Sequence, residues 1–421
     1  MLKQGLSLLL SFSFYTLSQG ICLTSATAQI PSDGSNSITT KYDIDEKWFQ
    51  QSLVEDNLSH WLNSAITNNG FFRVTLNRQW QPAAEQTATL VSQSRLLYVM
   101  AEGYQITQNQ KYLDAVKKGA DFLLANFRKD EGEWYWSVSP EGELIDETES
   151  PYGYAFAIFG LSHAHRVTGY EPYLDAAMTT ALQLDLWADI KTFPNKRPED
   201  SWTQNHMMHT FEALLVLHDV TKDNQILENA RLLADFIFDQ LYQQEDGYLP
   251  EAFDANWKPL KIEEGGYVDI GHQVEWAFFL SRAVAEKGFP EHYLDIGGRL
   301  LNFGLQNGYD HEQGGIFNRS SYSGQISNSD KVWWGQSEFI RAVMQYASFH
   351  DRQDLWPQYQ QTLQFVQKYF LDSEYGGWFS EPIDPRLPND EHLKGHIWKA
   401  GYHVIGMYVH ALQLYEQGLV E

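Results

Sequence analysis

A short glycine-aromatic motif recurs along the 421-residue chain and limits the folds that the chain can adopt. Its copies are NNGFF at 68–72, EGEWY at 131–135, DGYL at 246–249, QGGIF at 313–317 and YGGWF at 375–379. The last glycines of successive copies lie 62, 115, 68 and 62 residues apart. Because 115 is close to twice the other intervals, we place a degenerate copy near Lys191–Phe193. A regular period of this length dictates architecture, and it predicts six units of roughly 60 residues.

Each unit reads as two helices, because apolar residues recur at spacings of three and four. The predicted helices cover 94–107, 111–127, 154–168, 208–221, 226–243, 274–286, 338–350 and 403–415. Strand signals are confined to the short glycine-aromatic loops. Some helices, such as ALLVLHDV and YAFAIFGL, are apolar nearly all round, which is typical of helices enclosed by others. Twelve helices in six hairpins therefore predict an all-α (α/α)6 barrel, as a single domain over 43–421.

The first 28 residues are typical of a secretory signal peptide. Lys3 supplies the positive charge, residues 6–15 form an apolar run, and Ala26–Ala28 is a small-x-small cleavage site. Residues 29–42 are rich in Ser, Thr, Asn, Gly and Pro, and they predict a flexible leader. We therefore expect a periplasmic or secreted protein.

A lipoprotein anchor at Cys22 is the competing interpretation, but Ile21 fits poorly where such signals require a small residue. Cleavage after Ala28 would remove this cysteine, the only one in the chain, so we expect neither disulfides nor cysteine catalysis. No later stretch reaches the roughly 18 to 20 apolar residues that a membrane span needs.

The charge of the chain narrows the class of partner. Acidic residues outnumber basic ones by 55 to 30, which gives a net charge of -25. Phosphate backbones are bound by Lys and Arg, so nucleic-acid binding is not expected. Aromatic residues make up 14% of the chain, which excludes extended disorder. We expect a small-molecule partner and a monomer or homodimer.

Polar side chains on the apolar helices mark a candidate site, because burying them is unfavourable unless they are paired or functional. One such residue falls in each unit, and the steps between them are 59, 55, 63, 64 and 67 residues. The six are Arg95, Tyr154, His209, His272, Gln336 and His403. Since the steps follow the repeat, we expect these side chains to meet at one end of the barrel.

Further candidates flank this set. Glu212 and Glu275 each follow a histidine by three residues, as an orienting partner, a sugar ligand or a counter-ion of Arg95. Trp334 and Trp398 are either core aromatics or stacking platforms for a sugar. The histidines lack the i, i+4 spacing of zinc motifs, and no nucleotide fingerprint is present, so we predict neither metal nor cofactor.

Two histidines and one arginine suit proton abstraction next to a carbonyl. Imidazole has a pKa near neutrality and can both take and return a proton. Arg95 would stabilise the enediolate. If two of the histidines lie on opposite faces of the carbon, one removes the proton and the other returns it inverted, which is 2-epimerisation of an open-chain sugar.

The strings SQSRLLY, NHMMHTFEA, LPEAFDANWKP, GHQVEW, KVWWGQSE and WKAGYH resemble the N-acylglucosamine 2-epimerase superfamily over residues 43–415. That superfamily includes cellobiose and mannose 2-epimerases and mannose and sulfoquinovose isomerases. The resemblance implies an (α/α)6 barrel and metal-free acid–base chemistry through an enediolate. It implies catalytic roles for His403, His272 and Arg95. It implies substrate-binding or orienting roles for His209, Glu212, Glu275, Trp334 and Glu338.

The chain also departs from the family pattern. The family often has Gln at Tyr154 and Pro at Gly335 and Gly401, so the substrate is less constrained than the reaction. An aldose-ketose isomerase of the mannose/fructose type shares the same intermediate and remains the main alternative. A glycoside hydrolase or lyase using Glu275 or Glu338, and a non-catalytic sugar-binding module, are the lesser alternatives.

Overall fold

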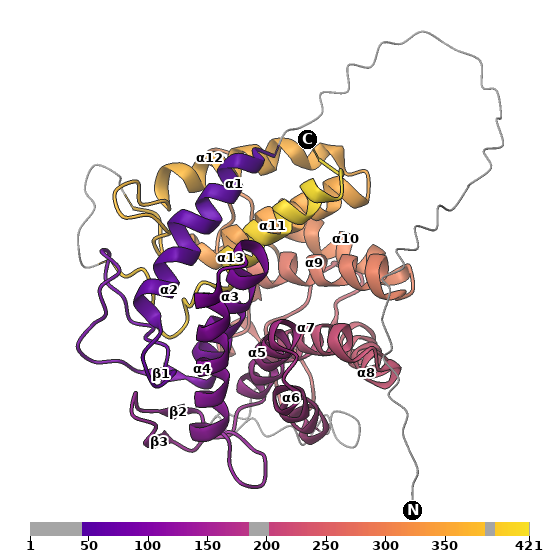
Figure 1. Ribbon diagram of the computed structural model, residues 1–421. Helices are drawn as coiled ribbons and strands as arrows, with labels where there is room; N and C mark the ends of the chain where they lie inside the picture. The colour runs from indigo at the N-terminus through magenta and orange to yellow at the C-terminus, as the bar shows by residue number, and fades with distance from the viewer. Residues whose placement is uncertain (1–43, 185–201, 384–391, 421) are drawn as a thin grey trace, which may run out of the picture. The chain divides into compact units, whose positions relative to one another are not determined.

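The computed structural model describes residues 44–184, 202–383 and 392–420, which all belong to one compact unit (Figure 1). The predicted signal peptide, the leader and the degenerate repeat near 191–193 lie outside the described residues. Within the described part, no helix is both long and apolar enough to cross a membrane.

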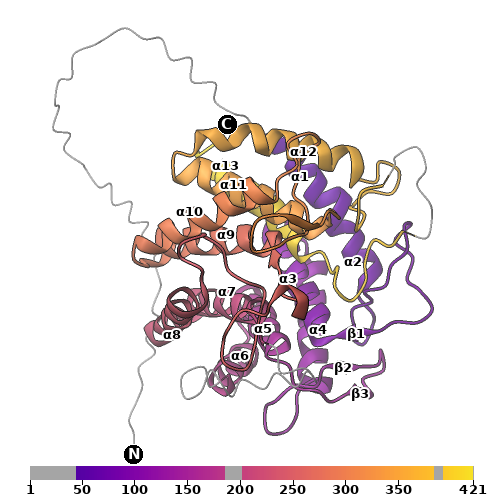
Figure 2. The ribbon, with the colours of Figure 1, turned by 180° about the vertical axis from the view of Figure 1, so that it is seen from behind.

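Six long helices form a closed inner ring, and each packs against an outer helix (Figures 1 and 2). The inner helices are α3 (Leu90–Thr107), α5 (Pro151–Thr168), α7 (Gln204–Thr221), α9 (Ile270–Lys287), α11 (Trp333–Phe349) and α13 (Tyr402–Glu416). Five outer helices are α4 (Gln110–Asn126), α6 (Glu171–Gln183), α8 (Asn224–Phe236), α10 (His292–Asn307) and α12 (Trp356–Tyr369). Each inner helix contacts the next, and α13 contacts α3, so the ring closes. The predicted (α/α)6 barrel is confirmed.

Burial separates the inner helices from the outer ones. In α3 the buried residues run without a break from Leu90 to Gly103. In α4 they recur only at helical spacing, beginning with Tyr112, Ala115 and Val116. An inner helix is therefore covered on all sides, whereas an outer helix keeps one face in solvent.

The inner helices begin one to five residues before the predicted starts. Their first turns carry polar and small residues, which hide the helical pattern but supply the caps. The Thr89 side chain accepts a hydrogen bond from the Ser92 amide, and Asp269 accepts one from the His272 amide. Such caps satisfy amides that have no partner within the helix.

The strands differ from the prediction. The glycine-aromatic loops carry only isolated bridges, such as Ile66 with Phe72. The longer pairings lie between these loops and the inner helices, in segments too short to show alternation. The antiparallel sheets are β1 (Ala88–Thr89) with β2 (Ser137–Val138) and β3 (Leu144–Asp146), β4 (Trp202–Thr203) with β5 (Ala252–Phe253), and β6 (Val268–Asp269) with β7 (Arg319–Ser320) and β8 (Ile326–Asn328).

A side chain at the fourth position of an inner helix fastens most glycine-aromatic loops. A glutamine amide there accepts from a loop N–H and donates to the carbonyl of the same residue, over 2.7–3.0 Å. The pairs are Gln93 with Phe72, Gln273 with Leu249 and Gln336 with Ile316. In α5 the hydroxyl of Tyr154 takes this place and accepts from the Trp134 amide over 3.3 Å.

The sixth outer helix comes from the beginning of the fold. α1 (Glu46–Leu53), a π-helical turn (Val54–Leu58) and α2 (Ser59–Ala65) follow one another without a break. α1 packs against α13, so the first helical segment covers the last inner helix (Figure 1).

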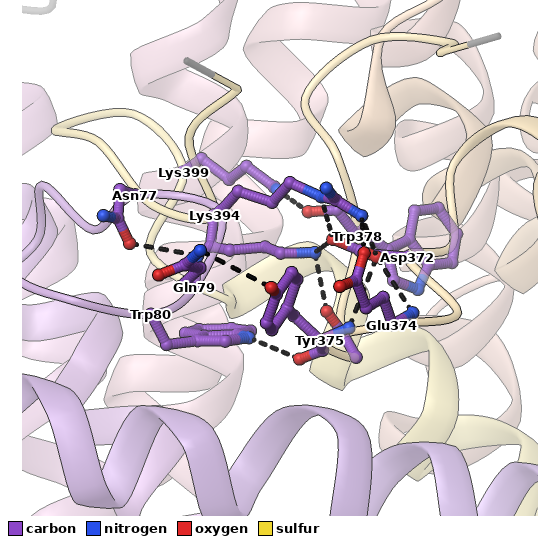
Figure 3. A network of polar contacts seen from close by, with 11 residues as sticks. Asn77, Gln79, Trp80, Asp372, Glu374, Tyr375, Trp378, Lys394 and Lys399 are labelled. Carbon is purple, nitrogen blue, oxygen red and sulfur yellow. Dashed lines mark hydrogen bonds and ion pairs between the residues drawn. The ribbon is translucent and has the colours of Figure 1, made fainter. Parts of the chain in front are cut away.

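A buried ion-pair network joins the loop after α2 to the loop after α12 (Figure 3). Asp372 accepts hydrogen bonds from Arg78 Nε at 2.9 Å and from Lys394 Nζ at 2.8 Å. The indole N–H of Trp80 donates to the carbonyl of Tyr375 over 2.9 Å. This network therefore adds polar contacts between the two chain segments that meet where the barrel closes.

Candidate active site

The sixth residues of five inner helices form one layer inside the ring. They are Arg95, Phe156, His209, Glu275 and Glu338, and α13 meets this layer with Tyr402 and His403. The Phe156 ring lies 4.3 Å from the Arg95 guanidinium carbon and 4.8 Å from the His209 ring. His272 and His403 stand in the first turns of α9 and α13. Most of the predicted polar set therefore meets at the N-terminal ends of the inner helices.

His403 is held by a carboxylate from the neighbouring helix. Its Nδ1 lies 2.8 Å from Glu338 Oε1 and 3.9 Å from Glu275 Oε1. Burial lowers the pKa of His403 well below its usual value, and the positive charge of Arg95 lowers it further. The imidazole is therefore neutral at physiological pH and able to accept a proton.

The two carboxyl groups beside His403 are fully buried. Burial raises the pKa of Glu338 to about 7. Burial and the nearby Glu338 raise the pKa of Glu275 well above its ordinary value. Within the described residues neither oxygen of Glu275 has a hydrogen-bond partner. Its surroundings therefore favour the protonated form of Glu275 over the carboxylate.

His272 is in the opposite electrostatic state. Burial by itself would lower its pKa, but the carboxylates of Glu251 and Asp269 raise the pKa to about 10. Its Nδ1 lies 2.7 Å from Glu251 Oε2, and Gln204 Nε2 donates to that same oxygen over 2.9 Å. His272 is therefore an imidazolium at neutral pH, held in orientation by Glu251.

Trp334 contacts both histidines. Its indole centre is 5.0 Å from the His272 ring and 5.6 Å from the His403 ring. An aromatic wall thus adjoins the neutral imidazole and the imidazolium alike, as a substrate-contacting role for Trp334 requires.

Arg95 is a buried cation whose partners are neutral. Its guanidinium donates to the Trp398 carbonyl over 3.0 Å and to the Tyr152 hydroxyl over 2.8 Å. Among the residues that the structure describes, no carboxylate forms an ion pair with Arg95, so Glu212 and Glu275 are not its counter-ions. Its charge is available to an anionic oxygen.

His209 and Glu212 form their own pair on α7. His209 Nδ1 lies 3.0 Å from Glu212 Oε2, and the Tyr402 hydroxyl donates to Glu212 Oε1. Burial would raise the pKa of Glu212, but the hydrogen bond from His209 lowers it below the ordinary value. Glu212 is thus an ionised carboxylate one turn along α7 from His209, and it orients that histidine.

Two predicted site residues lie apart from this cluster. Tyr154 fastens the loop at Trp134, as described above, and shares that position with Gln336. The Trp398 side chain is 44% exposed, with its ring 6.4 Å from Trp136, and it is the Trp398 carbonyl that reaches Arg95. Residues that anchor a loop and residues of the site both recur with the period of the repeat. Their spacing in the sequence therefore does not distinguish the two kinds of residue.

Several residues of the cluster were not singled out as site residues from sequence. Glu251 lies beside β5, outside any helix, so helical phase could not place it next to His272. Tyr402 and Tyr152 open inner helices, and Arg341 follows Glu338 by three residues, one turn further along α11. The two tyrosines are recognisable from sequence as residues that open inner helices, but they were not assigned to the site.

Three groups of the cluster are close enough to hold a metal ion. One donor atom each from Glu275, Glu338 and His403 lies within 4.8 Å of the others. The same arrangement lets the two carboxyl groups share a proton, because like charges so close cannot both ionise. The buried histidines with opposite protonation states and the adjacent buried arginine can perform acid–base chemistry without an ion.

Comparison with known proteins identifies the family of the chain. Residues 70–407 match the family model of N-acylglucosamine 2-epimerase (GlcNAc 2-epimerase). A D-mannose isomerase from Marinomonas mediterranea is 24% identical over 383 residues, which cover 86% of this chain and 96% of the relative. A cellobiose 2-epimerase from Bacteroides fragilis is 24% identical over 387 residues, which cover 84% of this chain and 95% of the relative.

A solved structure shares the fold. A crystal structure of D-mannose isomerase superposes with a TM-score of 0.78 at 23% sequence identity. The match covers 88% of this chain and 99% of that chain. The helical barrel therefore extends over the full length of a sugar-converting relative.

Proposed function

Because the chain belongs to the N-acylglucosamine 2-epimerase family, we propose that it interconverts C2 epimers of a reducing sugar through an enediolate. The sugar is of the mannose and glucose type or a short β-1,4-linked oligosaccharide. The named relatives are a sugar isomerase and a sugar 2-epimerase, and the chain is an enzyme of the isomerase class. The proposal depends on the opposite pKa shifts of His403 and His272.

His403 is the base in the proposed forward step. With Glu338 ionised, the Nδ1 hydrogen of His403 points to that carboxylate and Nε2 presents a lone pair. Nε2 takes the proton from C2 of the open-chain aldose, and the C2 electron pair moves into the C1–C2 bond. The carbonyl oxygen at C1 then carries the negative charge.

Arg95 stabilises that charge. It is 3% exposed and makes no ion pair within the described residues, so its charge acts in a poorly solvated site. Charge stabilisation is strongest where water is excluded and the donor is already oriented. Trp398 and Tyr152 supply that orientation through their oxygen atoms.

His272 completes the epimerisation. It delivers its proton to C2 on the opposite face, which restores the C1 carbonyl and inverts the configuration. His403 is then protonated and His272 neutral, the states required for the reverse reaction. Pairs of titratable groups with opposed pKa shifts are typical of acid–base catalysis.

An aldose-ketose isomerase is the second candidate, and the similarity to a D-mannose isomerase favours it. In that reaction the enediolate is protonated at C1 rather than at C2. Both candidates use the same base and the same stabilising cation.

Proton NMR in D2O distinguishes these reactions. The purified protein is incubated with mannose, glucose, cellobiose or mannobiose, and the C2 proton and anomeric signals are followed. We expect loss of the C2 signal and appearance of the epimer's anomeric signals. A ketose product would identify the isomerase instead. Cleavage products, or binding without exchange, would refute both candidates.

The pH profile tests the role of His272. Since its pKa is about 10 and it must be protonated, kcat/KM should fall as the pH rises through 10. Glu251→Gln removes a charge that raises this pKa, so the alkaline limb should move to lower pH. The control Glu264→Gln alters an exposed carboxylate that pairs with Lys261, and it should leave the limb in place. An unshifted limb in Glu251→Gln would contradict the assignment.

A further inference from the structure

A second cavity lies further along the inner helices than the histidine cluster. Its volume is about 100 Å³. It is lined by ninth and thirteenth residues of several inner helices, including Tyr98, Glu102, His163, Arg282, Arg341 and His410. Pockets for drug-sized ligands usually measure about 300 Å³ or more. This cavity therefore suits a few water molecules or one small ion.

The acidic side chains around the cavity are already engaged. Each carboxylate accepts from a neighbour in the part of the chain that the structure describes. The pairs are Glu286 with Arg282, Asp219 with Lys287, Glu212 with His209 and Tyr402, and Glu102 with Gln105 and His163. In these pairs, carboxylates that line the cavity balance the positive charges of Arg282 and Lys287. Within the described residues, no carboxylate that lines the cavity forms such a pair with Arg341.

Arg341 is buried, and its hydrogen bonding within the described residues is incomplete. Its Nη1 lies 3.5 Å from Glu338 Oε2, at the limit of a hydrogen bond, and that carboxyl has a pKa of about 7. Within the described residues the Nε atom has no hydrogen-bond partner. Gly406 lies against the guanidinium, because a Cβ there would come within 3.3 Å of Nη1. Burial by itself would lower the pKa of Arg341, but nearby carboxylates, Glu338 first, raise it, and the guanidinium carbon lies 3.9 Å from the centre of the Phe278 ring. The unsatisfied part is therefore the buried Nε donor, which is unfavourable unless another group accepts from it.

His410 adds a neutral donor to the same cavity. Its side chain is buried, and Nε2 has no hydrogen-bond partner among the described residues. Burial and the charges of Arg341 and Arg282 lower the pKa of His410 well below its usual value. The imidazole faces two guanidinium groups and is neutral. It can therefore donate an N–H hydrogen bond into the cavity without adding a positive charge.

We propose that this cavity binds one small inorganic anion, such as chloride, between Arg341 and His410. The anion would accept from the buried Nε of Arg341 and satisfy the buried imidazole nitrogen. Arg166, which also lines the cavity, is exposed and adds a further cation to the lining. Glu212 and Tyr402 belong to both this cavity and the histidine cluster, but the anion takes no part in the sugar chemistry, so the proposal does not depend on the proposed function.

Chloride titration tests the proposal with the full chain. The protein is transferred to sodium isethionate, whose anion is bulkier, and chloride replaces it at constant ionic strength while the melting temperature is recorded. A saturable rise is expected, because a ligand that binds only the folded state stabilises it. The rise should be lost in His410→Leu and kept in His218→Leu, which alters a histidine outside the cavity lining.

Crystals soaked in sodium bromide locate the anion directly. An anomalous peak between Arg341 and His410 is expected. If His410→Leu fails to fold, Gly406→Ala narrows the space beside Arg341 and should weaken the chloride effect instead. Equal, non-saturating melting curves in wild type and variant, or bromide peaks only at other places, would overturn the proposal and leave a water-filled cavity.

Discussion

Replacing His403 by alanine is expected to slow exchange of the substrate's C2 proton by about 10²- to 10⁴-fold, the range that general acid–base groups contribute. The variant retains Arg95, His272 and Trp334 but lacks the one neutral imidazole that adjoins Glu338. Binding should change less than turnover, because the base acts on the transition state. The measurement is the rate of loss of the C2 proton signal in D2O.

His218→Ala is the matched control. His218 also lies on an inner helix, but near the last turn of α7, and its Nδ1 has no hydrogen-bond partner in the described residues. Circular dichroism of both variants shows whether the fold is retained. Full exchange in a folded His403→Ala protein would refute the proposed base, whichever product the enzyme forms.

The second large effect concerns stability, at the network in Figure 3. Asp372→Asn should lower the free energy of unfolding by about 3–5 kcal/mol, the usual cost of removing one partner of a buried ion pair. Asp372 accepts from Arg78 and Lys394, and its side chain is 2% exposed. The substitution would leave two buried cations without the carboxylate that they share. Urea unfolding at neutral pH measures the loss.

Asp310→Asn provides the comparison. Asp310 occupies the same place in the preceding repeat, but within the described residues it binds a single cation, Lys331, over 2.7 Å. Its loss should amount to about 1.5–3 kcal/mol, as for one hydrogen bond to a charged group. If Asp310→Asn proves as destabilising as Asp372→Asn, the shared carboxylate does not have the role assigned to it.

The loss of stability caused by Asp372→Asn should become smaller at acid pH. Burial would raise the pKa of Asp372, but the hydrogen bonds from Arg78 and Lys394 lower it to about 2, against an ordinary value of 3.8. Its contribution is therefore complete above pH 3.8 and declines as the pH falls towards 2. The difference between wild type and variant should shrink over that interval.

The repeat in the sequence predicted much of the fold because it reports the period of the helix pairs. The predicted segments 154–168 and 208–221 end at the observed ends of α5 and α7. Their starts were late, since polar caps and first-turn residues break the apolar pattern. The covering of α13 by α1 was not predicted, because no local pattern reports which distant helix fills a gap in a ring.

The site residues could likewise be predicted where they follow the repeat and not where they lie outside it. Arg95, His209, Glu275 and Glu338 share a helical level, so the repeat phase could bring them together. Glu251, which raises the pKa of His272, reaches the site from a loop that has no helical phase. The pKa shifts depend on burial and on charges from several helices, and neither is visible in a linear pattern.

Because α1 packs against α13, the barrel cannot be completed until the last inner helix has been synthesised. Because chains emerge from the ribosome N-terminus first, α1 (Glu46–Leu53) must keep an apolar face uncovered until Tyr402 and the residues after it have been made. The earlier hairpins can associate during synthesis, but the ring cannot close. A nascent chain stalled before Tyr402 should therefore remain a chaperone substrate, and release should follow only when α13 is complete.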